Sequence, residues 1–131
     1  MRLSVRALAD ALVLRLNAQL PAGLWLTVDT PEVWGGTALF MNSEEGSWGG
    51  SGIANMDETV DDSEVDSIVE AALDAIQDDV AHASRGMAWP RDPTAVGPLP
   101  QPWARVARNV LSFGYGSLTF GPGIDLDQIA A

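Results

Sequence analysis

Five acidic side chains recur at steps of four residues, and they are Asp62, Asp66, Glu70, Asp74 and Asp78. Residues four apart are neighbours on one side of a helix, so this spacing predicts a ridge of carboxylates with like charges adjacent. Such a ridge is either a solvated face that keeps the protein soluble or a docking surface for a basic partner, whose binding relieves the repulsion. Both interpretations stay open, and Asp66, Glu70, Asp74 and Asp78 are candidate partner-binding residues.

A second acidic pattern has the spacing of a calcium-binding loop. Its oxygen-bearing residues at loop positions 1, 3, 5, 7, 9 and 12 are Asn55, Asp57, Thr59, Asp61, Ser63 and Asp66. Val60 stands where the sharp turn of such a loop needs Gly, and Asp66 replaces the bidentate Glu that completes the coordination sphere. We therefore expect no metal site, and no motif indicates a cofactor.

The residues that common enzyme mechanisms require are scarce. His82 is the only imidazole, and the chain has neither Cys nor Lys. Ser51 lies in a Gly-Gly-Ser-Gly-Ile run, which misses the nucleophile elbow because Ile53 takes the place of the final Gly. Acid–base chemistry needs two carboxyl groups in different environments, whereas these carboxylates all look solvated. We expect a non-catalytic protein, and the alternative is an enzyme with a carboxylate-based site.

Two of the five tryptophans, Trp34 and Trp48, are each followed by two glycines. Glycine leaves the neighbouring ring accessible, so both rings could anchor a protein interface or stack on a sugar. The alternative is that both rings fill the core and the glycines make room for them. Trp34 and Trp48 are therefore also candidate partner-binding residues.

Charge excludes several classes of partner. The net charge is −11, and fourteen of the eighteen acids lie between residues 16 and 84, a stretch without a single Arg. Binding to nucleic acid or to anionic lipid depends on cations, so neither partner is expected. The N-terminal residues lack the pattern of a signal peptide, and no apolar run is long enough to span a membrane. We expect a cytoplasmic protein.

Two amphipathic helices should position these residues. Apolar residues at three- and four-residue steps predict a helix over residues 4–20, with Ser4 as its N-cap, and a second helix over residues 62–84 that carries the acidic ridge. Residues 85–104 contain five prolines and two tryptophans. We interpret this segment as an irregular crossover pinned by its tryptophans, although its proline spacing also suits a polyproline II ligand.

Short β-like segments fill the remainder of the chain. Three are expected between the helices, at residues 24–29, 36–42 and 48–54. After the crossover, residues 104–107, 110–113 and 117–120 predict two hairpins, with turns at Arg108-Asn109 and at residues 114–116, and residues 124–131 form a final helical turn or fray. The sequence therefore predicts one α+β domain over residues 1–131, in which an antiparallel sheet of five or six strands packs on two main helices.

The predicted order of elements, α-β-β-β-α-β-β(-β), resembles that of small acidic secretion chaperones. The same order suits a structural adaptor of the kind found at phage head–tail joints. Both resemblances imply a protein-binding role without catalysis. Our leading hypothesis is a small acidic protein-binding or adaptor module that acts as a homodimer or binds a basic protein partner through the second helix or the tryptophan-bearing strands.

Overall fold

A computed structural model describes residues 1–30, 36–52, 58–86, 88–91 and 99–131, with the backbone alone described for residues 48–52. The elements of these residues, in chain order, are β1 (Arg2–Ser4), α1 (Val5–Asn17), β2 (Trp25–Asp29), β3 (Ala38–Ser43), β4 (Gly46–Gly52), β5 (Thr59–Asp61), the 3-10 turn η1 (Asp62–Glu64), α2 (Val65–Ala83), β6 (Pro102–Ala107), β7 (Val110–Tyr115), β8 (Leu118–Thr119), β9 (Ile124–Asp125) and the 3-10 turn η2 (Leu126–Ile129). The α+β class and the predicted order of the main elements are confirmed.

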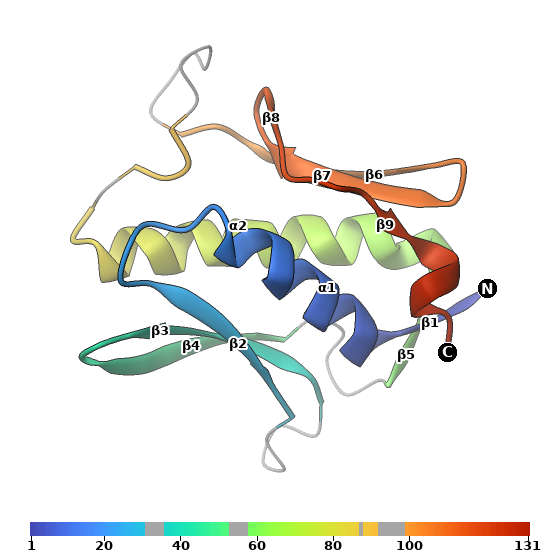
Figure 1. Cartoon of the computed structure of the whole chain (residues 1–131), viewed down its shortest axis with the longest axis horizontal. Helices are drawn as coiled ribbons and strands as arrows, with labels where there is room; N and C mark the ends of the chain where they lie inside the picture. Colours follow the sequence, from blue (N-terminus) through green and yellow to red (C-terminus); the bar gives the residue numbers. More distant parts are fainter. Residues whose placement is uncertain (31–35, 53–57, 87, 92–98) are drawn as a thin grey trace.

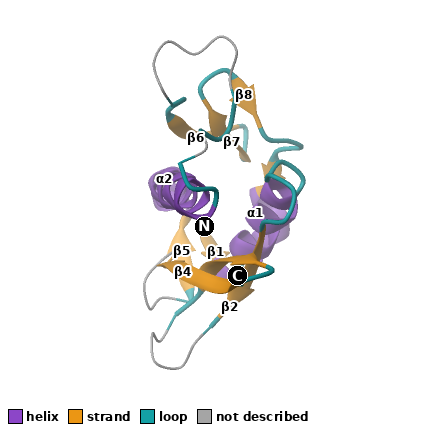
Figure 2. Ribbon diagram, turned by 90° about the vertical axis from the view of Figure 1, so that its left-hand side faces the viewer, coloured by secondary structure: helices purple, strands orange, loops and turns teal. Residues whose placement is uncertain are grey.

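The two helices form a middle layer between two antiparallel sheets (Figures 1 and 2). On one side lies the meander β2-β3-β4, and on the other lies a sheet in which β7 pairs with β6, β8 and β9. A short third sheet joins β1 to β5. The strands are thus divided among three sheets, whereas the sequence predicted one sheet of five or six strands. None of the described helices is long and apolar enough to cross a membrane.

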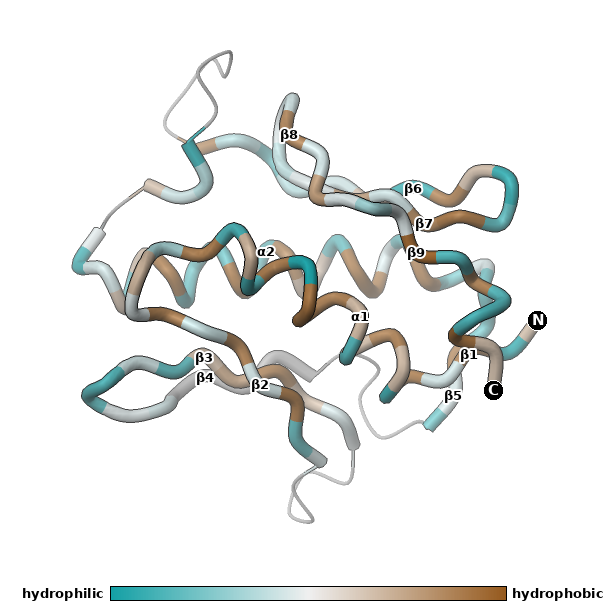
Figure 3. Tube along the Cα trace, viewed as in Figure 1, coloured by the Kyte–Doolittle hydropathy of each residue, from teal (hydrophilic) through white to brown (hydrophobic). Residues whose placement is uncertain are grey.

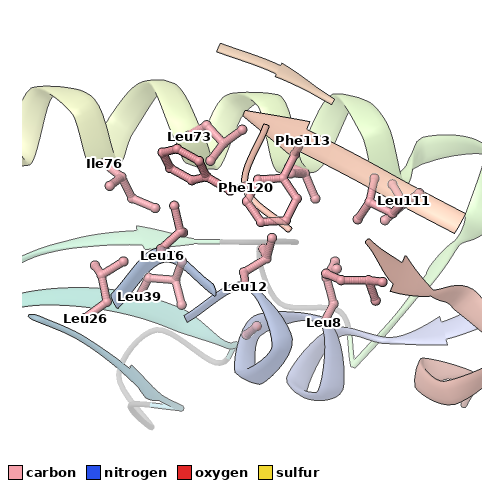
Figure 4. Packing of buried hydrophobic residues seen from close by; sticks show 14 of the residues in the cluster. Leu8, Leu12, Leu16, Leu26, Leu39, Leu73, Ile76, Leu111, Phe113 and Phe120 are labelled. Atoms are coloured by element: carbon pink, nitrogen blue, oxygen red, sulfur yellow. The ribbon is translucent and has the colours of Figure 1, made fainter. Parts of the chain in front are cut away.

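The core lies between the helices and the two larger sheets. Figure 4 shows Leu8 and Leu12 of α1 pointing toward Leu111 and Phe113 of β7, and Leu16 lying beside Leu39 of β3. The apolar positions of both helices recur among hydrophilic ones along the chain (Figure 3), and the residues of this stripe in α2 are buried. The helices form because burying these stripes stabilises them more than their intrinsic propensity does.

A side chain accepts a hydrogen bond from the backbone at the start of α1 and at the start of the 3-10 turn η1 that leads into α2. The hydroxyl of Ser4 accepts from the N–H of Ala7 at 3.2 Å, which confirms the predicted cap of α1. Before α2, the carboxylate of Asp61 accepts from the N–H of Ser63 at 3.0 Å and so caps the turn η1. Free N–H groups at a helix start need such acceptors, which explains why α1 starts after Ser4. Asp61 serves the turn η1, and Glu64 at the start of α2 itself makes no side-chain cap.

The predicted hairpin between β6 and β7 is confirmed. Arg108 and Asn109 both have positive φ angles, of 52° and 64°, which is the geometry of a two-residue type I′ turn. The second turn differs from the prediction, because β7 continues through Gly114 and Tyr115 and the chain reverses at Gly116. A side chain at Gly114 would collide with the backbone of Leu118, so glycine here permits β8 to pass close to β7.

The pairing of β1 with β5 was not predicted. Leu3 lies opposite Val60, and the backbone of Ala131 donates to the carbonyl of Arg2. Both termini therefore lie side by side at the same end of the molecule (Figure 1). These strands contain three residues each, too few to show an alternating pattern in the sequence.

The crossover after α2 is anchored in the core by Trp89. Its buried ring packs edge-on against Tyr115 at 5.2 Å between centroids, and its indole N–H donates to the carbonyl of Gln19 at 3.0 Å. The buried amide of Gln77 donates to the carbonyls of Trp89 and Pro100 and so ties both ends of this segment to α2. Pro102 and Trp103, which the sequence placed in the irregular segment alone, belong to β6. Residues 92–98, which include Pro93 of the predicted PxxP motif, lie outside the described residues.

Candidate functional site

The acidic ridge lies on the outer side of α2. Glu70, Asp74 and Asp78 are exposed and Asp66 is half-buried. The opposite side of the helix carries the residues that pack into the core, namely Val65, Val69, Ala72, Leu73, Ile76, Gln77 and Val80. The spacing of four residues thus has the geometric result that the sequence predicts, since one side of α2 is apolar and another presents carboxylates.

Among the described residues, no cation forms an ion pair with Asp66, Glu70, Asp74 or Asp78. Asp62, at the start of the ridge, lies 3.5 Å from the N-terminal ammonium group. The carboxylate of Asp66 accepts a hydrogen bond from the N–H of Ser67. Of the ridge, only Asp62 is therefore paired with a described cation, and the other carboxylates lie next to like charges on the surface of α2.

Two open depressions follow each other between α2 and β6, and together we name them the α2–β6 groove. The first has a volume of about 600 Å3 and is lined by Asp62, Ser63 and Asp66 on one side and by residues 103–106 of β6 on the other, with Asn109 and Leu126 at its end. The second has a volume of about 420 Å3 and is lined by Ser67, Glu70, Ala71, Asp74, Gln101 and Pro102. Asp78 lies outside both depressions.

Strand β6 borders this groove with an open edge. It pairs with β7 on one side, and no other described strand pairs with it. In the ladder of a two-residue hairpin, Ala107 and Val110 form a hydrogen-bonded pair, and such pairs alternate along the strands. Gln101 keeps this alternation, because its carbonyl accepts from the N–H of Gly116 at 2.8 Å. The N–H and C=O groups of Ala104 and Val106 therefore point away from β7, toward the open edge.

Pro102 fits this assignment. It occupies an outward-facing position, where a missing N–H removes no bond to β7. Sequence reasoning missed both the extent of β6 and its open edge. Proline is tolerated at the first residue of any strand, so Pro102 by itself did not indicate that β6 is an edge strand.

The outer face of β6 carries an aromatic ring and a cation. The guanidinium of Arg105 lies 5.2 Å from the centre of the Trp103 ring, and the indole N–H of Trp103 donates to the carbonyl of Gly116 at 3.0 Å. Arg105 thus places a positive charge at the groove, although its guanidinium forms no ion pair with a described carboxylate. One wall of the groove is acidic, and the rim of the other is basic.

The two tryptophans singled out in the sequence cannot be placed at this groove. Trp34 lies outside the described residues. The backbone of Trp48 pairs with Met41 in the β3–β4 ladder, and its side chain is not described. Their proposed role in an interface stays a prediction.

The structure describes only four of the six residues with the spacing of a calcium-binding loop. Asn55 and Asp57 lie outside the described residues, whereas Thr59 and Asp61 belong to β5. Hydrogen bonds hold Asp61 in its capping role: the N–H of Ser63, then its hydroxyl, then the side chain of Asp62 lower the pKa of Asp61 to about 2. No group of three or more His, Asp and Glu residues in the described part of the chain could hold a metal ion.

His82 is exposed at the end of α2, beside a depression of about 320 Å3 that also contains Ser43, Glu45, Ser47 and Arg85. The Ser43 hydroxyl accepts from the N–H of Glu45 and lies 3.5 Å from the carbonyl of Gly46, so it is held by its own turn rather than by an imidazole. Burial, together with the nearby charge of Asp78, raises the pKa of Asp79, but Asp79 lines none of these depressions.

The α2–β6 groove therefore combines backbone groups of β6 that pair with no described strand and the carboxylates of Asp66, Glu70 and Asp74, which have no ion pair among the described residues. Comparison of the chain with protein-family models, with curated proteins and with solved structures gave no match.

Proposed function

We propose that this protein is a non-catalytic protein-binding module that recognises a basic segment of a partner protein at the α2–β6 groove. The observation that carries the proposal is that Asp66, Glu70 and Asp74 line an open groove without an ion pair to any described cation. Four acids, Asp62, Asp66, Glu70 and Asp74, and one cation, Arg105, line the groove, so negative charge predominates there and attracts partners of the opposite charge. A basic partner would also relieve the repulsion between neighbouring acids on α2.

The secretion-chaperone and phage-adaptor resemblances fit this proposal, because both classes act by binding other proteins. A homodimer is compatible with it only if the groove stays accessible. The net charge of −11 disfavours placing two copies of the acidic ridge face to face.

The test compares two variants that remove the same number of charges. The groove variant carries Asp66→Asn, Glu70→Gln and Asp74→Asn, and the control variant carries Glu44→Gln, Glu45→Gln and Asp127→Asn, three exposed acids elsewhere on the surface. Immobilised wild-type, groove-variant and control proteins are incubated with a cell lysate at low and high salt, and the retained proteins are identified by mass spectrometry.

We expect the wild-type and control proteins to retain the same basic partners, and we expect the groove variant or high salt to release them. Exposed charges are screened by salt, so a partner recognised by charge must be salt-sensitive. Retention of the same proteins by the groove variant would contradict the proposed function.

A further inference from the structure

We propose that the partner segment binds in an extended conformation as an additional strand on the open edge of β6. This inference rests on the proposed function and specifies how the α2–β6 groove recognises its partner. The occupant is a segment of a basic protein with Arg or Lys at alternate positions.

The first argument is the state of the β6 edge. Ala104 and Val106 direct N–H and C=O groups away from β7, and no other described strand pairs with them. Residues 103–106 all line the same depression, although their side chains alternate between the two faces of the sheet. Four consecutive strand residues can share one depression only if the strand presents its edge to it. An open edge is a template for pairing with another extended chain.

The second argument concerns the face that meets α2. Ala104 and Val106 lie opposite Phe113 and Leu111, whose side chains are buried, so their own side chains are on the face toward α2. Alternate side chains of an added strand would lie on that same face, next to the acidic wall of the groove. Positive charge at these positions would be paired by Asp66 and by Glu70.

The third argument concerns the residues of the added strand that lie between those facing α2. Trp103 and Arg105 lie on the other face of β6, toward solvent. An Arg or Lys of the added strand on that face would lie beside the Arg105 guanidinium, and like charges on neighbouring strands are destabilising. The groove therefore favours alternation of basic with uncharged residues over a continuous basic run.

The test uses a synthetic ten-residue peptide of alternating Arg and Val with a fluorescent label, and its binding is measured by fluorescence anisotropy. The decisive variant is Ala104→Pro, which removes the outward N–H without removing a bond to β7. Its matched control is Ala104→Val, which keeps that N–H. We expect the control to bind as the wild type does and the proline variant to bind about tenfold more weakly or worse, because one backbone acceptor of the peptide is left unpaired.

A second measurement keeps the wild-type protein and so does not depend on how the proline variant folds. The same peptide, N-methylated at every second residue, keeps its charge and loses the N–H groups along one edge. Two N-methylated peptides, one for each edge, are compared with the unmodified one. We expect methylation of one edge alone to abolish binding, and peptide binding to slow hydrogen exchange at the amides of Ala104 and Val106.

The outcomes separate the two proposals. Equal affinity of the wild-type protein for all three peptides would overturn strand addition, and so would tight binding by a folded Ala104→Pro variant. If strand addition is overturned in this way but the groove variant with neutralised acids does not bind the peptide, the proposed function survives. If the groove variant binds the peptide as tightly as its control does, the proposed function fails as well. Pairing of β6 with a second copy would appear as a dimer in sedimentation that the peptide does not dissociate, and this result would also overturn the inference.

Discussion

The two helices contribute to one core in the same way, but they differ in what their outer sides do. On α1, Arg6 pairs with Asp10 at 3.3 Å, and the Arg15 guanidinium donates to the carbonyls of Pro122 and Gly123. The charges of α1 are thus matched by partners within the molecule. On α2, the Asp66 carboxylate accepts a hydrogen bond from the N–H of Ser67, but no described cation forms an ion pair with Asp66, Glu70, Asp74 or Asp78.

This difference indicates which surface is available for binding. A polar group that already has an internal partner must give it up before it binds another molecule, whereas an unpaired exposed group has only water to lose. The charged groups on the outer side of α1 therefore serve the fold, and the proposed partner is expected at the outer side of α2. If this comparison is right, substitutions in the shared core should affect both helices equally, and substitutions of the acidic ridge should affect α2 in its own way.

The largest effect should come from the shared core. Leu12 of α1 and Leu73 of α2 are both buried to within about 1% of full burial. We expect Leu12→Ala and Leu73→Ala each to lower the free energy of unfolding by about 3 kcal/mol, since each leaves a cavity. Urea denaturation followed by circular dichroism measures this, and a cost for one helix several times smaller than for the other would refute the equivalence of the two helices.

The next largest effect on stability should come from Gln77, a buried polar residue on the inner side of α2. Replacing Gln77 by Leu would leave the carbonyls of Trp89 and Pro100 without their donor inside the protein. We expect a loss of about 2 kcal/mol in the free energy of unfolding, because buried carbonyls without a hydrogen bond are costly. Gln77→Glu is the informative companion, since it keeps the shape and lacks the donor. An unchanged midpoint in both variants would mean that Gln77 does not fasten the crossover.

A smaller effect of opposite sign should come from the ridge. Neutralising Asp66, Glu70, Asp74 and Asp78 together removes the three like-charge contacts among these residues and the one between Asp66 and Asp62, each worth a few tenths of a kcal/mol. We expect the free energy of unfolding to rise by about 0.5–1 kcal/mol at low salt, and the gain to shrink as salt screens the wild-type repulsion. Thermal unfolding over a salt series measures it, and a loss of stability would show that these acids serve the fold.

The smallest effect concerns how the two helices begin. Ser4, which caps α1, does not titrate in the relevant range, whereas Asp61 before α2 has its pKa lowered from 3.8 to about 2 by the hydrogen bonds of Ser63 and Asp62. A lowered pKa means that folding favours the charged form, so the stabilisation is complete above about pH 4 and is lost as the pH falls toward 2.

The substitution that isolates this contribution is Asp61→Asn, because Asn also caps helices but does not titrate. Acid unfolding of the wild type and of Asp61→Asn should show a stability difference that is constant near neutral pH and changes only between about pH 4 and pH 2. A difference that is the same at every pH would assign the effect of Asp61 to geometry and not to its charge.

Local patterns in the sequence determined most elements of this protein. Three- and four-residue periodicity indicated α1 and α2, Ser4 marked the start of α1, and Arg108-Asn109 marked a tight hairpin. These signals are readable because a helix, a cap or a turn depends on residues that are close in the chain. The position of the carboxylates along α2 follows from the same periodicity.

Only the tertiary structure decided the rest. Three-residue strands such as β1 carry no pattern of their own, so the division of the strands into three sheets depends on contacts between distant residues. The same holds for Gln77, whose partners lie 12 and 23 residues away, and for β6, whose edge is open because of where α2 and β7 pack. The sequence by itself thus determined which residues are acidic and helical, and the long-range packing decided which groove they border, because that packing depends on burial summed over the whole core.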